Sequence, residues 1–222
     1  MSDAAPTLDL HFDFISPYAY LAWTQIERIA GAHGRRVRLV PVLFAAMLDS
    51  FGTVGPAEVP AKRDYGYLDV HRKAALLGVP LTMPPRHPFA PLTSLRAATS
   101  FTDPTERARA VGALFRAAWV TGDGVDTPAL VQEALDAAGL DGPGAVSRAA
   151  APEGKTALLH ATNDAIARGV FGVPTIAVGT ETFWGTDALP TLEQFLRGRD
   201  PITPELRERL RAIPVGVQRK RG

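Results

Sequence analysis

Apolar and polar residues alternate at the start of the chain and then change to a helical spacing. Over residues 7–14 every second position is leucine or phenylalanine, which is typical of a strand. Apolar residues recur at helical spacing over residues 17–33, and a second apolar run covers residues 37–43. A strand, a helix and a strand this close together predict a parallel βαβ unit with a right-handed crossover.

The middle of the chain, residues 45–168, carries helical patterns and no clear strand. Amphipathic spacing predicts helices over residues 61–78, 104–121, 127–138 and 153–168. Five prolines between residues 79 and 91 interrupt these helices and predict a stiff loop. This loop is either a plain connector or a cover over a pocket, with Phe89 or His87 facing a ligand.

Strand patterns return near the end of the chain. Residues 174–178 are mostly β-branched and apolar, a Gly-Thr turn follows, and residues 181–184 form a short pairing strand. A helix is expected after Asp187, and a smaller one over residues 204–212. The order βαβ, helical block, ββα predicts an α/β fold: a thioredoxin-like domain with an all-helical insertion. We expect residues 1–44 and 169–222 to form the thioredoxin-like domain, and residues 45–168 to form the inserted helical domain.

Composition narrows the chemistry that such a fold can carry. The 222 residues have a net charge of +1, which provides no field for nucleic acid or an anionic membrane. The chain contains no cysteine, so disulfides, thiolate metal sites and a cysteine nucleophile are excluded, and we expect no metal. The first six residues lack the basic and apolar regions of a signal peptide, and no apolar run is long enough for a membrane helix. We therefore expect a cytoplasmic protein.

Ser16 and Pro17 stand where the first strand pattern gives way to the helix pattern. Serine is a favoured N-cap, and proline is favoured at the first helical position. The junction therefore places a hydroxyl at the positive end of a helix dipole, beside N–H groups without helical partners. A thiolate or a carboxylate would be stabilised there. The simpler alternative is a serine that only starts the helix.

Val173 and Pro174 stand at the start of the third strand pattern. A cis bond between them is possible, because cis peptide bonds occur mainly before proline and mark tight turns. The backbone N–H and C=O of Val173 would then face outward and pair with an extended peptide. The alternative is a trans proline that opens an edge strand. The sequence Phe-Gly-Val-Pro-Thr over residues 171–175, together with the helix start at Ser16, favours the cis form.

Three motifs along the chain resemble one family. They are Phe12-Asp13-Phe14-x-Ser16-Pro17-Tyr18-x-Tyr20-Leu21, the sequence GVFGVPT over residues 169–175, and Phe183-Trp184-Gly185-x-Asp187. With a helical insertion of matching size, they resemble the 2-hydroxychromene-2-carboxylate isomerases. That family belongs with the kappa-class glutathione transferases in the DsbA-like branch of the thioredoxin superfamily. The resemblance covers residues 7–198 and implies a glutathione-binding enzyme, usually a homodimer, that acts on a small aromatic carboxylate.

The resemblance also implies roles for individual residues. Ser16 stands where disulfide oxidoreductases have a cysteine, and as the catalytic residue it would donate a hydrogen bond to the thiolate of glutathione. Val173, before Pro174, would pair through its backbone with the cysteinyl part of glutathione. Asp187, next to Thr186, would bind the γ-glutamyl ammonium, with nearby N–H groups taking the carboxylate.

The remaining candidate residues carry alternatives. Lys62 matches a family lysine that would meet a carboxylate or the anionic substrate, but without the family it is best interpreted as a solvated charge at a helix end. Asp187 is equally well interpreted as a helix N-cap. The substrate pocket would be lined by Tyr18, Thr53 and Phe89.

The chain departs from the family pattern at three single positions and in residues 86–95, which resemble the family's loop but lack its usual asparagine. Thr53 stands where asparagine is common, Thr186 where asparagine, serine or glutamine is common, and Ala188 where an arginine usually follows the aspartate. These departures bear first on the second-substrate pocket and then on glutathione binding.

Three functions follow from the resemblance. The first is a glutathione-dependent isomerase that interconverts 2-hydroxychromene-2-carboxylate and trans-o-hydroxybenzylidenepyruvate, or a related intermediate of aromatic compound catabolism, by reversible addition of a thiolate. The second is a kappa-like glutathione transferase or peroxidase that uses the same thiolate. The third is a glutathione-binding protein without turnover.

Overall fold

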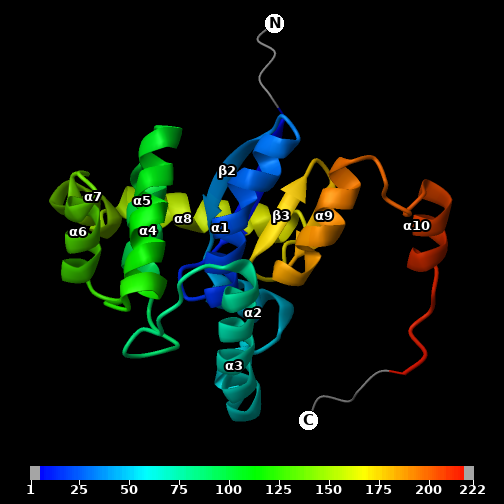
Figure 1. Ribbon diagram of the computed structural model, residues 1–222, viewed down its shortest axis with the longest axis horizontal. Helices are drawn as coiled ribbons and strands as arrows, with labels where there is room; N and C mark the ends of the chain where they lie inside the picture. Colours follow the sequence, from blue (N-terminus) through cyan, green and yellow to red (C-terminus); the bar gives the residue numbers. More distant parts are fainter. Residues whose placement is uncertain (1–5, 218–222) are drawn as a thin grey trace, which may run out of the picture.

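A four-stranded mixed sheet lies at the centre of the computed structural model, which describes residues 6–217 (Figure 1). The strands are β1 (Thr7–Phe12), β2 (Arg36–Pro41), β3 (Thr175–Val178) and β4 (Glu181–Trp184). Their order is β2-β1-β3-β4, with β1 parallel to β2 and antiparallel to β3, and with β3 antiparallel to β4. The predicted βαβ…ββα arrangement is therefore confirmed, and the fold is thioredoxin-like.

Ten α-helices and three short helical turns are found among the described residues. The helices are α1 (Pro17–Ala32), α2 (Phe44–Phe51), α3 (Pro60–Leu77), α4 (Leu92–Ser100), α5 (Pro104–Arg116), α6 (Pro128–Ala137), α7 (Gly142–Ala150), α8 (Pro152–Ala167), α9 (Leu189–Leu196) and α10 (Pro204–Arg211). The turns η1 (Pro56–Glu58) and η3 (Thr186–Ala188) are 3₁₀-helical, and η2 (Ala117–Thr121) is π-helical. None of the described helices is both long and apolar enough to cross a membrane.

The predicted elements match these bounds closely, with two kinds of difference. The helix predicted over residues 104–121 is α-helical only to Arg116 and continues as the π-helical η2. The sequence patterns also single out none of α2, α4 and α7. Residues 79–91 form a loop, as predicted.

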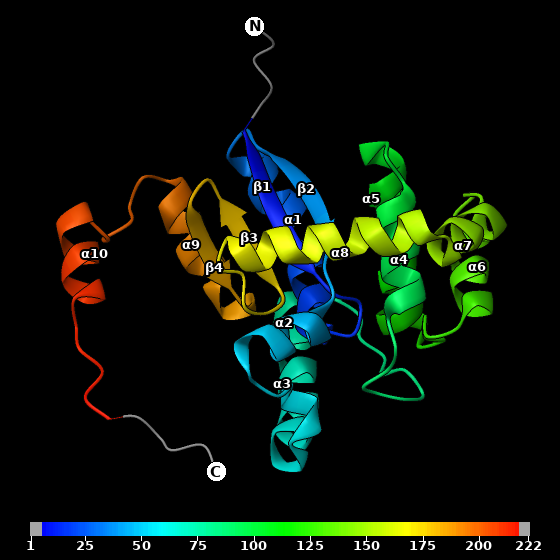
Figure 2. The same cartoon turned by 180° about the vertical axis from the view of Figure 1, so that it is seen from behind.

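Helices cover both faces of the sheet. In Figure 1, α1 and α9 lie in front of the strands and α8 lies behind them, and Figure 2 shows the reverse side with α8 in front. Helices α4 to α7 gather on the side of the sheet where β2 lies, whereas α9 and α10 lie on the β4 side. All helices from α2 to α8 lie between β2 and β3 in the sequence, as expected for an insertion.

The sheet and the helical block share one hydrophobic core. The rings of Phe12 and Phe14, from β1 and the turn after it, contact Phe115 of α5 at centroid distances of 5.3 and 4.9 Å. All three are fully buried, and the same core continues into α4, α6 and α7. The end of β1 is thus packed directly against the helical block. The division of the chain at residues 44/45 and 168/169 stays a prediction, and its outer limits include residues 1–5 and 218–222, which lie outside the described range.

Candidate functional site

The candidate residues meet at one edge of the sheet because of the strand directions. Strand β3 runs antiparallel to β1, so Thr175 lies opposite His11 and the residues before β3 lie beside the end of β1. Strand β4 is antiparallel to β3 and therefore ends at the same edge. Ser16, the Val173-Pro174 pair and the turn at residues 186–187 are in this way brought together.

Ser16 is the N-cap of α1, as predicted. Its Oγ accepts a hydrogen bond of 3.1 Å from the N–H of Ala19. The hydroxyl proton of Ser16 and the N–H of Tyr18 have no acceptor among residues 6–217. The side chain therefore caps the helix with its oxygen lone pair and keeps its O–H free to donate. An anion at this position would meet two free donors at the positive end of α1.

The helical block holds the turn that precedes Ser16. The indole Nε1–H of Trp119 donates to the carbonyl oxygen of Phe14 at 2.9 Å. Nε2 of His87 lies 2.8 Å from the carbonyl oxygen of Ile15 and must carry the proton, because the partner only accepts. Burial lowers the pKa of His87 and thereby favours the neutral ring. His87 thus supports the backbone of the site from the proline-rich loop.

Asp13 is fully buried beneath the same turn. Its Oδ1 accepts from the N–H of Ile15 at 3.1 Å, and its Oδ2 accepts from the N–H of Phe44 at 2.9 Å. Burial raises the pKa of Asp13 to about 7, although both hydrogen bonds act to lower it. One carboxyl group therefore ties the end of β1 to the start of α2 and titrates near neutral pH.

The bond between Val173 and Pro174 is cis, as predicted. Neither the N–H nor the C=O of Val173 has a partner within the described part of the chain. The carbonyl oxygen of Pro174 accepts from the N–H of Gly185 at 2.9 Å, which fixes the turn that carries Thr186 and Asp187. A free donor and a free acceptor on one residue form the minimal edge to which an extended peptide can pair.

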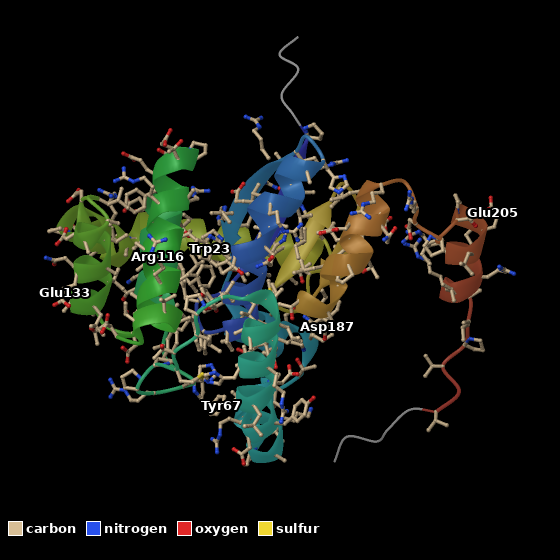
Figure 3. The ribbon with its side chains drawn as sticks, viewed as in Figure 1. Trp23, Tyr67, Arg116, Glu133, Asp187 and Glu205 are labelled. Carbon is tan, nitrogen blue, oxygen red and sulfur yellow. The ribbon has the colours of Figure 1, made fainter. Side chains whose placement is uncertain are left out.

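Asp187 points away from the sheet toward α3 (Figure 3), whereas Thr186 is buried. The N-cap of α9 is Ala188, which makes no side-chain cap, so the alternative of Asp187 as a helix cap is wrong. The carboxylate instead pairs with Nζ of Lys73 on α3 at 3.1 Å. Lys73 also contacts Asp69 at 2.8 Å, and the hydroxyl of Tyr18 donates to that same carboxylate at 2.7 Å.

Lys73 is a site residue that the sequence analysis did not identify. Positions 62, 66, 69 and 73 follow helical spacing, so Lys62, Gly66, Asp69 and Lys73 share one face of α3. A Cβ on Gly66 would lie 3.9 Å from the Tyr18 hydroxyl, so this face is turned toward the start of α1. The helical spacing between Lys62 and Lys73 is the sequence signal from which Lys73 could have been identified. Lys62 itself is exposed and lies about 16 Å from Lys73 along the helix axis.

The predicted pocket residues Thr53 and Phe89 lie in different surroundings. Thr53 is exposed in the loop after α2, next to Phe51, whose ring contacts that of Phe171 at 6.5 Å. The structure therefore brings the Thr53 loop to the segment before Val173. Phe89 is buried and packs at 6.2 Å against Trp119. It lies in the core behind the site and is not brought to the site's surface.

Three exposed aromatic rings lie beside the cis bond and were not identified as a group from the sequence. Phe51, Phe171 and Trp184 are 40%, 46% and 56% exposed, and the rings of Phe171 and Trp184 are 5.1 Å apart. Gly172 permits this contact, because a Cβ there would lie 2.8 Å from Nε1 of Trp184. They come from the end of α2, the segment before β3 and the end of β4. We name them the aromatic cluster.

No group of three or more metal-binding side chains occurs among residues 6–217. The edge itself offers hydrogen-bond donors, a helix dipole, a free peptide edge and the charges of Asp69, Lys73 and Asp187.

Comparisons with known proteins agree with this geometry. Residues 7–197 match the family of DSBA-like thioredoxin domains. A curated 2-hydroxychromene-2-carboxylate isomerase of Pseudomonas putida is 35% identical over 84% of this chain and 92% of its own length. A glutathione S-transferase kappa 1 of Caenorhabditis elegans is 24% identical over 90% of this chain and 95% of its own. A solved structure of a 2-hydroxychromene-2-carboxylate isomerase is 29% identical, covers 94% of this chain and 100% of its own, and superposes with a TM-score of 0.75.

Proposed function

This chain belongs to the DsbA-like thioredoxin family, within the group of 2-hydroxychromene-2-carboxylate isomerases, and is an isomerase, and we propose that its cofactor is glutathione. The proposed reaction interconverts 2-hydroxychromene-2-carboxylate and trans-o-hydroxybenzylidenepyruvate, or a related intermediate of aromatic compound catabolism. That the protein is a homodimer and is located in the cytoplasm stays a prediction.

One observation carries the proposal: the unpaired backbone of Val173 lies at the same sheet edge as the free hydroxyl proton of Ser16. Glutathione is an extended peptide with a thiol in its middle residue, so it needs a peptide edge and a donor for the sulfur. Both are present among the described residues. The chain has no cysteine, so a thiol at this edge must belong to a ligand.

Ser16 would donate its hydroxyl hydrogen to the ligand's sulfur, and the free N–H of Tyr18 would add a second donor. Together with the α1 dipole, these groups favour the thiolate and lower the thiol pKa from its usual value near ~8.5. Bound glutathione supplies the sulfur that adds reversibly to the substrate's conjugated double bond, so that the bond can rotate. Removal of one such donor typically reduces a rate by about 10²–10³-fold.

The substrate is proposed to lie against the aromatic cluster. An aromatic ring stacks favourably on exposed rings, and Phe171 stands only two residues before Val173. Lys62 would attract the substrate carboxylate, and Tyr18 and Thr53 would complete the pocket. Phe89 would support the pocket indirectly, by packing against Trp119.

The test is the isomerisation of 2-hydroxychromene-2-carboxylate, followed by ultraviolet absorbance with and without glutathione. We expect turnover only when glutathione is present, with saturation in both compounds. Equal rates without glutathione would overturn the cofactor assignment. The reaction should also be followed in protein-free glutathione solution, which gives the uncatalysed rate.

A kappa-like transferase is the second candidate, favoured by the match to the glutathione S-transferase kappa 1 proteins. The same thiolate would then attack an electrophile or a peroxide. Conjugation of a chloronitrobenzene and reduction of a hydroperoxide, measured beside the isomerisation, separate the two. A kcat/KM for conjugation above that for isomerisation would favour the transferase.

A further inference from the structure

Lys73 stands between two carboxylates that come from different parts of the chain. Its Nζ lies 2.8 Å from Asp69, one helical turn away on α3, and 3.1 Å from Asp187 on the turn after β4. The side chains of Lys73, Asp69 and Asp187 are 26%, 17% and 81% exposed. Asp69 and Lys73 are thus mostly covered, whereas the carboxylate of Asp187 is open to a ligand.

The hydrogen-bonding capacity of this pair is only partly used. A lysine ammonium has three N–H donors and no acceptor. Two are taken by Asp69 and Asp187, and no third acceptor occurs within the described residues. Among residues 6–217, the carboxylate of Asp187 accepts only from Lys73. A free cationic donor and free anionic acceptor positions therefore lie about 3 Å apart.

Tyr18 fixes Lys73 in this place. Its hydroxyl donates to the Asp69 carboxylate at 2.7 Å, and Nζ of Lys73 lies 5.2 Å from the centre of the Tyr18 ring. Burial alone would lower the pKa of Lys73, but the hydrogen bonds to Asp69 and Asp187 raise it overall, so the ammonium stays charged. Tyr18 is the second residue after Ser16, which puts the charged pair on the flank of the proposed thiol position.

We propose that Lys73 binds the α-carboxylate of the γ-glutamyl group, beside the α-ammonium that the family resemblance assigns to Asp187. This inference rests on the proposed use of glutathione. An ammonium and a carboxylate on one carbon form a zwitterion whose two charges match an adjacent anion and cation. Two other positions do not supply this cation: the residue after Asp187 is alanine, and Lys62 lies about 16 Å from Lys73 along α3.

The test is isothermal titration calorimetry with three peptides and three lysine variants. The peptides are glutathione, γ-aminobutyryl-cysteinylglycine, which lacks the α-carboxylate, and glutaryl-cysteinylglycine, which lacks the α-ammonium. Lys73→Met should bind glutathione about 10- to 100-fold more weakly than the unchanged protein does. It should bind γ-aminobutyryl-cysteinylglycine within about twofold of the unchanged protein, because the group that Lys73 contacts is missing.

Matched controls keep the result interpretable. Lys155→Met removes an exposed lysine of α8 and should leave all three affinities unchanged. Lys73→Arg keeps the charge and should recover part of the glutathione affinity. Binding of γ-aminobutyryl-cysteinylglycine by Lys73→Met shows in the same experiment that the variant is folded.

Two outcomes overturn the inference in different ways. If Lys73→Met weakens glutathione and γ-aminobutyryl-cysteinylglycine equally, or weakens neither, Lys73 does not contact the α-carboxylate, although glutathione use stands. If the unchanged protein binds none of the three peptides, the proposed function fails and the inference fails with it.

Discussion

The indole N–H of Trp119 donates a hydrogen bond of 2.9 Å to the carbonyl oxygen of Phe14, across 105 residues of sequence. Trp119 lies in the π-helical turn of the helical block, and Phe14 lies two residues before Ser16. His87 makes the equivalent contact to the next carbonyl, that of Ile15. The proposed donor at Ser16 is therefore positioned by residues of the insertion as well as by its own helix.

Replacement of Trp119 by phenylalanine should loosen this support. The variant leaves the Phe14 carbonyl without its donor in a buried place, which costs about 1–3 kcal/mol of unfolding free energy. Trp23→Phe is the matched control, because Trp23 packs against Phe115 but its indole makes no hydrogen bond among the described residues. Urea denaturation of both variants measures the difference. Equal losses in the two would show that the hydrogen bond contributes nothing beyond ring packing.

Ser16→Ala should reduce both stability and rate, for separable reasons. Loss of the cap to Ala19 costs about 1 kcal/mol of unfolding free energy. Loss of the hydroxyl donor should lower kcat/KM by about 10²–10³-fold and raise the pKa of bound glutathione, read from thiolate absorbance against pH. Ser16→Thr keeps the hydroxyl and should retain most of the cap, while Ser147→Ala on exposed α7 surface controls for a distant change. An unchanged rate in Ser16→Ala would remove Ser16 from the mechanism.

Asp13 should make stability fall as pH rises from about 4 to about 7. Its pKa is raised to about 7 in the folded chain from an ordinary value of 3.8, so the folded state binds more protons in this window. Stability then decreases with rising pH by at most ~1.4 kcal/mol per pH unit and levels off above about pH 7. Asp13→Asn removes the titration and is the reference against which the slope is measured.

Chemical denaturation of both proteins at pH 5 and pH 8 checks this sign. The unfolding free energy of the unchanged protein minus that of Asp13→Asn should be larger at pH 5 than at pH 8. A difference that is larger at pH 8 would mean that the two N–H donors from Ile15 and Phe44 outweigh burial and hold Asp13 ionised.

Trp184→Ala should weaken binding of the aromatic substrate and leave the affinity for glutathione unchanged. The ring is 56% exposed and packs on Phe171, so its removal opens the aromatic cluster without disturbing the buried core. We expect a KM for the aromatic substrate that is raised about 5- to 30-fold, with the glutathione Kd within twofold. Trp184→Phe keeps a ring and should lie between the two. Equal loss of both affinities would place Trp184 in cofactor binding instead.

Local sequence signals were enough to predict the sheet, the Ser16 cap and the cis bond before Pro174. Each of these depends on residues that are close in sequence: alternating apolar positions for β1, a serine before a proline for α1, and the Val-Pro pair beside a β-branched run. The thioredoxin-like order followed from the same patterns. Asp103 and Thr127 also cap α5 and α6 where the helices were expected to begin.

The features that escaped prediction depend on contacts between distant residues. Residues 142–150 read GPGAVSRAA, which is poor helix-forming sequence, yet α7 forms because Asp141 caps it and Ala145 and Ala149 pack in the core. The residues around Lys73 in the sequence do not distinguish it from an ordinary exposed lysine. Its ion pair with Asp187, which is 114 residues away in the sequence, forms only in the folded chain. The packing of Phe89 against Trp119 depends on how the proline-rich loop folds back.

The pairing of Lys73 with Asp187 divides the proposed recognition between two stretches of sequence. Ser16 and Val173 belong to the sheet portion, whereas Lys73 comes with the helices between β2 and β3. A chimera that received residues 45–168 from a relative would thus exchange Lys73, together with the Trp119 and His87 that hold the turn before Ser16, and would keep Ser16, Val173 and Asp187. Both halves of the proposed site, the thiol donor and the amino-acid end, therefore depend on contacts between the insertion and the sheet portion.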